Sequence, residues 1–466
     1  MSDGSAAESP APAPTLRAVF AGPRGRLLIA LLIGEFGGAV QGIAYSTVLP
    51  LAACDLHGSA LYGATLAAAT LSSIFMLALG PAPLERLGFS AAIGIATVLF
   101  AIGAALSALA PDMVWILIGN VIRGLSMGII AGLGYAALGS LYEDALRPRV
   151  FGLFAFMWLV PSLVGPLVNA GIASAVGWRW AMVWPAVLVI GGRVLMWRSA
   201  AIIPRQRSGA RVSPLIGFGV VGALVLASWT SSEQGPWAWL GYLVGLCAAV
   251  GLSLLLIVRA SGGARRRVFA LTAFFGSCVV YFAAESVMPL AVVGGLGGSV
   301  LAGGLVVGAA GVGWSLLGLV PVRGVPGQGR LFGRAPMGVM LVGLGMIALA
   351  LAVLSRSATI GVPVAVAAGA VIGVGMGMAY TVQSAANFND LEPTRVSAVA
   401  TAAAFAETGS ITVGSLLTGG SYSLATSAGA HAASTLATGF LVLAALAVVV
   451  TALTTAALRR PDRVVP

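Results

Sequence analysis

The sequence predicts an all-α membrane protein made of two six-helix bundles with an inserted helix pair, fourteen transmembrane helices in total. Three observations support this fold class: the composition, the placement of the arginines and an internal repeat. Hydrophobic residues make up 59% of the 466 residues and charged residues only 8%, whereas charged residues form about a quarter of a typical soluble domain. The composition therefore excludes a soluble protein of this length.

The apolar stretches set the expected helices. A membrane-spanning helix needs about 20 mostly apolar residues. We expect such helices at residues 27–50, 60–82, 89–110, 113–141, 150–175, 180–198, 213–231, 237–258, 268–292, 297–321, 335–355, 358–382, 396–420 and 432–458.

These helices divide the chain into segments. We expect a disordered cytoplasmic tail (1–26), an N-terminal six-helix bundle (27–199), a cytoplasmic linker (200–212), an inserted two-helix hairpin (213–259), a basic cytoplasmic loop (260–267), a C-terminal six-helix bundle (268–458) and a cytoplasmic tail (459–466).

The arginines test this topology. All 25 basic residues are arginines. With the N-terminus inside, all but four of them fall in cytoplasmic segments; Arg179 and Arg356 lie in outer loops, and Arg123 and Arg193 lie within helices. Arg193 is near enough to the inner end of its helix for its guanidinium to reach water. Cytoplasmic loops of membrane proteins carry this excess of arginine, so the net charge of +11 reflects topology, with both termini cytoplasmic, rather than a nucleic-acid surface.

An internal repeat relates the two bundles. "STVLPLAACDLHGSALYGATLAAA" from Ser46 is similar to "ESVMPLAVVGGLGGSVLAGGLVVGA" from Glu285, and "GLSMG" from Gly124 is similar to "GVGMG" from Gly373. The repeat skips the pair at 213–258. Two similar halves with a binding site between them at the membrane midplane are the plan of a secondary transporter.

The same motifs resemble those of the major facilitator superfamily, specifically its fourteen-helix drug:proton antiporter-like branch, over residues 27–458. "STVLPLAACDL" is similar to the end of the family's first helix, and "PLERLG" to its loop between helices two and three. "IRGLSMG" resembles the fourth-helix motif, whose arginine is Arg123, and "PSLVGPLVNAG" resembles the fifth-helix antiporter motif. The resemblance implies a major-facilitator-type fold and transport by alternating access.

The chain also departs from these motifs. Phe89 and Ser90 stand where the family has a basic pair, and Ser126 stands where a glutamine is expected. Gln41 occupies a position at which drug exporters usually carry an acid. The departures weaken the antiporter detail more than the family assignment.

Four charges lie deep within the expected helices, and they are the candidate proton-coupling residues: Glu35, Arg123, Glu285 and Glu407. A charge in hydrocarbon costs at least a few kcal/mol and seldom occurs without a use. Glu35 and Arg123 are expected to pair, either as a permanent ion pair or as a proton site that Arg123 tunes. If Arg123 pairs with Glu35, no intramembrane arginine remains to pair with Glu407. Glu407 is then either a proton or substrate-cation site or a neutral acid that is hydrogen-bonded to a neighbouring helix. Glu285 either takes part in transport or faces water at the outer end.

Two further sets complete the candidate site. The substrate-cavity candidates, which suit an apolar or aromatic substrate if they face the cavity rather than lipid, are Gln41, Tyr45, Trp158, Phe274, Tyr281, Tyr380 and Phe405. The candidates for conformational motifs, among which the prolines free carbonyls and permit bending, are Glu85, Arg86, Gly88, Pro161, Gly165 and Pro166.

The function predicted from the sequence is proton-coupled export, by antiport, of lipophilic or cationic small molecules across a bacterial inner membrane. The alternatives are a proton-coupled uptake symporter and a lipid translocator. A membrane enzyme or receptor is disfavoured, because no nucleophile, metal or phosphate motif appears and no loop is long enough to form a domain. We expect no catalytic residue, metal or cofactor. The expected partners are the substrate, protons and the bilayer, with the protein acting as a monomer.

Overall fold

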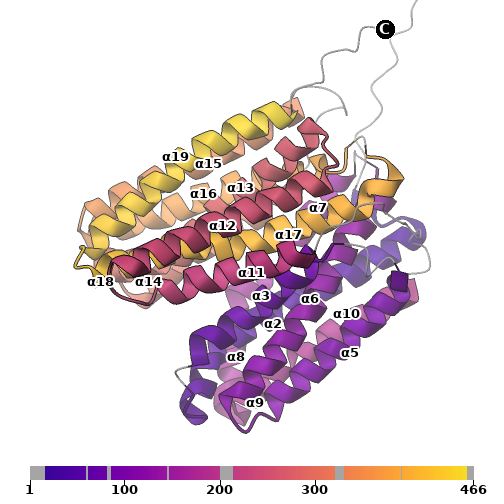
Figure 1. The fold of residues 1–466 in the computed structure, drawn as a ribbon, viewed down its shortest axis with the longest axis horizontal. Helices are drawn as coiled ribbons and strands as arrows, with labels where there is room; N and C mark the ends of the chain where they lie inside the picture. The colour runs from indigo at the N-terminus through magenta and orange to yellow at the C-terminus, as the bar shows by residue number, and fades with distance from the viewer. Residues whose placement is uncertain are drawn as a thin grey trace, which may run out of the picture.

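The chain is almost entirely helical (Figure 1). The computed structural model describes residues 16–58, 61–80, 86–143, 146–199, 214–320, 330–389 and 391–458. The helices of the N-terminal half are α1 (Leu16–Val19), α2 (Gly22–Asp55), α3 (Tyr62–Ala78), α5 (Phe89–Ala108), α6 (Met113–Leu141), α7 (Arg147–Phe156), α8 (Leu159–Val176), α9 (Trp178–Val183) and α10 (Pro185–Ser199). Two more, α11 (Pro214–Thr230) and α12 (Pro236–Ala260), follow. The helices of the C-terminal half are α13 (Arg265–Leu290), η3 (Ala291–Gly295), α14 (Val300–Leu319), α15 (Arg330–Leu354), α16 (Ala358–Ala386), η4 (Pro393–Arg395), α17 (Val396–Ser415), η5 (Leu416–Gly420), α18 (Ser421–Ser427) and α19 (Ala432–Leu458).

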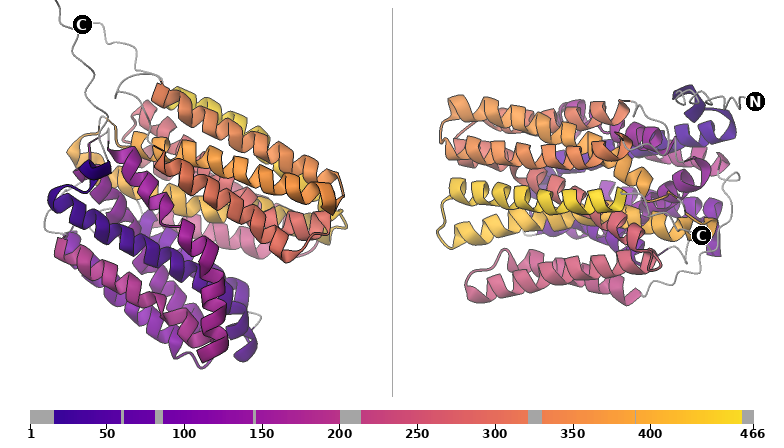
Figure 2. Two further views of the ribbon diagram at one scale, coloured as in Figure 1. Left: turned by 180° about the vertical axis from the view of Figure 1, so that it is seen from behind. Right: turned by 90° about the horizontal axis from the view of Figure 1, so that it is seen from above.

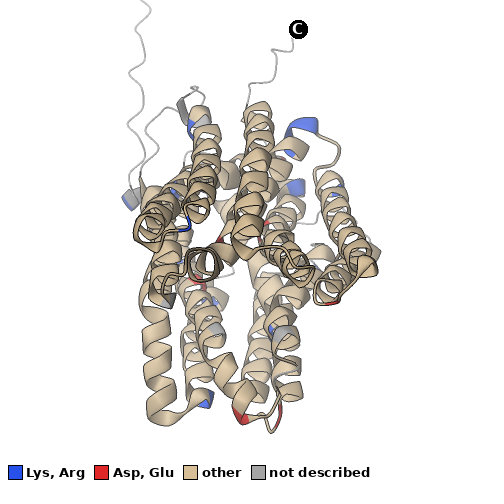
Figure 3. Cartoon of the chain, turned by 90° about the vertical axis from the view of Figure 1, so that its left-hand side faces the viewer, with Lys and Arg blue, Asp and Glu red and all other residues tan. Residues whose placement is uncertain are grey.

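The prediction of an all-α membrane fold is confirmed, but the expected number of spans is not reached. Within the described residues, 12 helices are long and apolar enough to cross a membrane, against the fourteen predicted. The predicted spans at 60–82 and 213–231 correspond to the shorter apolar helices Ala64–Ala78 and Leu215–Thr230. The helices that contain them, α3 and α11, have 17 described residues each, about 25 Å of helix, whereas a bilayer core is about 30 Å thick. Charged residues are sparse along all these helices (Figure 3).

The helices form two bundles (Figures 1 and 2). In the N-terminal half, α2 packs against α8 and α10, and α6 packs against α3 and α5. In the C-terminal half, α13 packs against α17 and α19, and α16 packs against α14 and α15. The two "G-x-x-M-G" segments each allow another helix of the same half to approach closely. A Cβ on Gly124 would overlap the backbone of Ala69, and a Cβ on Gly373 would overlap that of Ala310, so the lack of a side chain permits both close helix crossings.

The inserted pair, α11 and α12, lies along the seam between the halves. The two helices pack against each other; α11 also contacts α3 of the N-terminal half, and α12 contacts α17 of the C-terminal half. The Tyr242 hydroxyl on α12 donates a hydrogen bond to the Leu416 carbonyl at 2.7 Å. Leu416 is the first residue of η5, a short π-helical segment at the end of α17.

The N-terminal region is more helical than predicted. Helix α2 begins at Gly22, with Pro23 in its first turn, where the fixed φ of proline and its missing N–H suit a helix start. The Tyr142 hydroxyl, at the end of α6, donates to the carbonyls of Val19 at 3.0 Å and Arg24 at 3.3 Å. Burial raises the pKa of Tyr142 to about 12, so this phenol remains a donor at neutral pH. The predicted linker 200–212 lies outside the described residues.

The two halves meet at one end of the molecule, the end at which α1 begins and α19 finishes (Figure 2). Here α17 contacts α3 and α6, and α7 contacts α14 and α16. From this end the halves diverge, so that α9 and α18 lie at separate tips (Figure 1). We call the first the closed end and the second the open end.

Candidate functional site

The Glu407 carboxylate links the two halves. Glu407 lies on α17, and its Oε2 accepts a hydrogen bond from the Tyr135 hydroxyl on α6 of the N-terminal half. Its Oε1 accepts a second hydrogen bond, at 2.7 Å, from the Tyr380 hydroxyl on α16. The two hydroxyls are themselves 3.2 Å apart. One carboxylate thus joins three helices, and one of its two bonds crosses the seam.

Glu35 has a different partner from the one the sequence suggested. Its Oε1 accepts a hydrogen bond, at 2.8 Å, from the indole Nε1 of Trp158. Trp158 stands at the break between α7 and α8, just before Pro161, whose ring removes a backbone donor and permits such a bend. This bond lies within the N-terminal half, since Glu35 is on α2 and Trp158 lies between α7 and α8.

An aromatic wall connects Glu407 with Glu285. The Tyr281 hydroxyl donates to Glu285 Oε1 at 3.5 Å. The Tyr281 ring lies 4.7 Å from that of Trp314, and the Trp314 ring lies 5.3 Å from that of Tyr380, centroid to centroid. Because Tyr380 bonds Glu407, rings run without interruption from one acid to the other. The sequence analysis named Tyr281 and Tyr380 but missed Trp314.

Arg123 does not pair with Glu35, so the predicted ion pair is corrected. The Arg123 guanidinium lies 3.7 Å from the centroid of the Tyr45 ring and donates to Asn120 Oδ1 at 3.1 Å. Tyr45 is ten residues beyond Glu35 on α2, which is about 15 Å along the helix axis. Arg123 therefore reaches α2 at a different depth from Glu35. Counting residues along each helix separately did not reveal that Glu35 and the Arg123 guanidinium lie at different depths in the bundle.

Arg193 is buried rather than directed to water. It is 3% exposed and donates to the Ala96 carbonyl at 2.9 Å and to Ser126 Oγ at 2.7 Å. Its guanidinium lies 4.7 Å from the Phe100 ring, and that of Arg123 lies 5.7 Å from the same ring. Within the part of the chain that the structure describes, neither arginine forms an ion pair. Ser126, one of the departures from the family motif, is what gives Arg193 a side-chain acceptor.

Several predicted cavity residues are packed inside one half in this conformation. Phe274 and Phe405 are fully buried, and Gln41 is 3% exposed with its Nε2 donating to the Met182 carbonyl at 2.8 Å. Tyr45 is covered by Arg123. Trp158 is the exposed member of the set, at 44%.

The closed end is held by backbone contacts between the halves. Arg147 on α7 donates to the Phe388 carbonyl of the other half at 2.8 Å and to the Gly139 carbonyl of its own half at 2.9 Å. Further along α7, Ser315 Oγ on α14 donates to the Ala155 carbonyl at 3.3 Å. Gly152 lies so close to Gly318 that a Cβ on Gly152 would overlap the Gly318 carbonyl.

The predicted conformational motifs are placed as follows. Pro161, Gly165 and Pro166 all lie in α8, where Gly165 packs against Ile43 of α2. Gly88 precedes α5 with φ of 78°, a conformation that favours glycine. Arg86 is exposed, and Glu85 lies outside the described residues.

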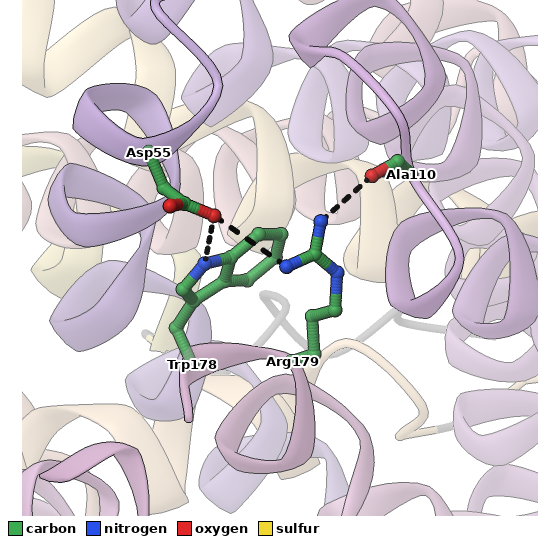
Figure 4. Close-up of polar contacts among 4 residues, drawn as sticks. All are labelled: Asp55, Ala110, Trp178 and Arg179. Atoms are coloured by element: carbon green, nitrogen blue, oxygen red, sulfur yellow. Dashed lines mark hydrogen bonds and ion pairs between the residues drawn. The ribbon is translucent and has the colours of Figure 1, made fainter. Parts of the chain in front are cut away.

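The open end of the N-terminal half is tied together without the other half (Figure 4). Asp55 Oδ2, at the end of α2, accepts from Trp178 Nε1 at 3.0 Å and from Arg179 Nη1 at 3.5 Å. Arg179 Nη2 also donates to the Ala110 carbonyl at 3.1 Å. These bonds join α2, α9 and the end of α5.

Among the described residues, no group of three or more His, Cys, Asp or Glu side chains lies close enough to hold a metal ion. The site thus consists of carboxylates, phenols and indoles. Carboxylates and phenols can exchange protons, and carboxylates and aromatic rings can contact cations.

The family follows from comparison with known proteins. Residues 28–415 match the model of the Major Facilitator Superfamily. The chain belongs to this family. The family comprises transporters, and membership agrees with the two-bundle fold and with the site at the seam.

Curated relatives include multidrug transporters. The chain is 29% identical over 144 residues to the "Probable multidrug-efflux transporter" of Mycobacterium tuberculosis (strain ATCC 25618 / H37Rv), a match that covers 29% of each chain. It is 23% identical over 239 residues to the multidrug transporter protein MdtP of Bacillus subtilis (strain 168), covering 50% of this chain and 43% of the relative. The matches thus span less than half the length of these relatives.

Solved structures share the fold. The human organic anion transporter MFSD10 matches with a TM-score of 0.63 at 14% identity, over 95% of this chain and 100% of that one. The Escherichia coli fucose:proton symporter FucP matches with a TM-score of 0.61 at 13% identity, over 93% and 98%. The predicted major-facilitator-type fold is confirmed; at these identities the likeness extends to the fold alone.

Proposed function

We propose that the protein is a proton-coupled exporter of lipophilic cations that works by alternating access in a bacterial inner membrane. It would belong to the fourteen-helix antiporter branch, with α3 and α11 also crossing the bilayer. The observation that carries this proposal is the Glu407 carboxylate, which is bonded across the seam to Tyr135. A protonatable group in that position couples proton binding to the contact between the halves.

The coupling follows from the strength of the bonds. A hydrogen bond to an ionised carboxylate is about twice as strong as one between neutral groups. When Glu407 is deprotonated, its bond to Tyr135 holds α6 against α17. When it takes up a proton from the open end, the bond to Tyr135 weakens and the closed end is free to part. The proton then leaves on the other side, and substrate drives the return.

The site chemistry supports a cationic, lipophilic substrate. Glu35, Glu285 and Glu407 supply negative charge, and the partly exposed Trp314 ring, packed against the buried rings of Tyr281 and Tyr380, supplies an aromatic surface between two of these acids. Cations are attracted to aromatic faces, by about 2 kcal/mol or more where water is excluded. The names of the bacterial relatives agree with efflux of this kind.

Transport in proteoliposomes tests the proposal, with ethidium as a lipophilic cation. An exporter by antiport accumulates ethidium when the vesicle interior is acidic, because protons leave as ethidium enters. A symporter accumulates it when the interior is alkaline. We expect the first result for the native chain and loss of gradient-driven accumulation for Glu407→Gln. Accumulation with the second gradient would establish symport, and no accumulation with either gradient would reject a lipophilic-cation substrate.

A further inference from the structure

A groove opens between α2 and α10 at the closed end, away from the seam. The two helices cross tightly near their middles: a Cβ on Gly192 would lie 2.8 Å from the Gly34 backbone nitrogen, and one on Gly37 would lie 2.9 Å from that of Val189. From this crossing the helices separate toward the closed end. The space between them has a volume of about 390 Å³, and its lining residues are Pro23, Arg26, Ile29, Ala30, Leu195, Arg198 and Ser199.

The lining is divided into a charged mouth and an apolar floor. Arg26 and Arg198 come from different helices and are both exposed. Neither forms an ion pair with any residue in the described ranges. Ile29 and Leu195, one turn deeper in the bilayer, are 47% and 44% exposed. Positive charge therefore stands at the membrane surface directly above apolar surface that faces lipid.

The start of α2 adds to the positive potential at the mouth. Pro23 occupies the first turn of this 34-residue helix, and no side chain caps its N-terminus. The first amides of a helix are unpaired donors and carry a partial positive charge. Anions bind at such positions, and here two arginines supplement the helix end.

We propose that this groove is a binding site for one anionic phospholipid of the leaflet at the closed end. The phosphate headgroup would lie between Arg26, Arg198 and the first turn of α2, and an acyl chain would lie on Ile29, Ala30 and Leu195. Arginine pairs phosphate through two parallel N–H donors. A soluble anion matches the mouth but leaves the apolar floor exposed, whereas a zwitterionic lipid matches the floor but places a positive choline beside the arginines.

Native mass spectrometry of the delipidated protein, titrated with phosphatidylglycerol, tests the proposal. We expect the native chain to retain one tightly bound phosphatidylglycerol, and Arg26→Gln/Arg198→Gln to bind it about tenfold more weakly. The matched control is Arg259→Gln/Arg265→Gln, which removes the same charge from exposed arginines of α12 and α13 at the same end and should change the affinity less than twofold.

A second variant and two other ligands separate the sources of binding. Leu195→Trp fills the floor and keeps both arginines, so it should also weaken phosphatidylglycerol binding. Inorganic phosphate should bind far more weakly than phosphatidylglycerol, as should phosphatidylcholine. The proposal is overturned if the control loses as much affinity as the groove variant, if Leu195→Trp binds normally, or if either comparison ligand binds as tightly.

Discussion

The Tyr135 hydroxyl of α6 donates a hydrogen bond to the Glu407 carboxylate of α17, joining residues 272 positions apart in the chain and on opposite sides of the seam. Tyr135→Phe removes this donor and keeps the ring, which packs 5.4 Å from that of Phe151. Hydrogen bonds to charged groups contribute about 1.5–3 kcal/mol, so the ratio of closed to parted molecules should fall about 10- to 100-fold. Distances between spin labels on α7 and α14 measure that ratio.

Tyr380→Phe is the matched control for this variant. It removes the other phenol bonded to Glu407 and the weaker contact of that phenol with Tyr135 across the seam, but it keeps the bond of Tyr135 to the carboxylate. The spin-label distances should then change much less than in Tyr135→Phe. Equal effects of the two substitutions would contradict a special role for the bond across the seam.

The closed end should respond to pH through Glu407. Raising the pH increases the deprotonated fraction of this acid, and the carboxylate accepts the stronger bond from Tyr135. The closed fraction should therefore rise with pH and fall as the acid is protonated. In Glu407→Gln the spin-label distances should not depend on pH. Glu35→Gln, whose Trp158 bond lies within one half, should keep the pH dependence, and its loss there would move the coupling to Glu35.

Gly152 limits how closely α7 approaches α14. A methyl group at this position overlaps the Gly318 carbonyl, so Gly152→Ala should prevent full closure and make the closed end accessible to a membrane-impermeant thiol reagent at an engineered cysteine. Gly171→Ala on α8 is the control, because a Cβ there has no atom within 4 Å. Normal protection of the cysteine in Gly152→Ala would show that the helices adjust without parting.

Tyr45 stabilises the N-terminal half through the cation that lies over its ring. Tyr45→Leu should lower the free energy of unfolding by about 2 kcal/mol, the strength of a desolvated cation–π contact, and this would appear in thermal denaturation of the purified protein. Tyr45→Phe keeps a ring beneath Arg123, and the Tyr45 hydroxyl has no hydrogen-bond partner among the described residues, so this variant should be close to the native chain in stability. A large loss in both variants would point to the hydroxyl instead.

The inserted pair gives a test of topology. If α11 and α12 both cross the bilayer, Ser232→Cys, in the exposed turn between them, should react only from outside the cell. Ala264→Cys, before α13, should react only from the cytoplasm. Cys54, Cys247 and Cys278 must be replaced first, since the first two are exposed. If both cysteines react from the same side, α11 and α12 do not cross the bilayer as a pair, and the protein has twelve crossings.

The sequence predicted the fold well because the bilayer imposes simple rules. The length of an apolar stretch and the placement of the arginines can be determined for each segment separately. The helices lie near the residues where these two rules placed them. The two helices that fell short, α3 and α11, are those next to residues 59–60, 81–85 and 200–213, which lie outside the described range. The start of α2 was predicted too late, at residue 27 rather than at Gly22. Pro23 and Arg24 do not belong to an apolar stretch, so the apolar-length rule left them out although both lie in the first turn of the helix.

The site was predicted only in part, because it depends on which helix faces meet. Glu407 was named as a proton-coupling candidate and Tyr380 as a substrate-cavity candidate, but Tyr135 was not named, and the sequence alone did not show that these three side chains meet. Arg123 was paired with Glu35 from charge alone. In the structure, Arg123 lies over the Tyr45 ring and Glu35 accepts a hydrogen bond from Trp158. Both partners are aromatic, so a search for opposite charges does not find them.

The buried arginines have an electrical consequence. Arg123 and Arg193 hold two positive charges in the apolar interior of the N-terminal half, supported by aromatic rings, carbonyls and neutral oxygens, with no ion pair in the described structure. A charge displaced through the full field of a membrane changes in energy by about 2.3 kcal/mol for every 100 mV. Under the proposed alternating access, a tilt of the N-terminal half against its partner would carry these two charges with it as gating charges. The membrane potential would then bias which side the empty protein faces, before any proton or substrate binds.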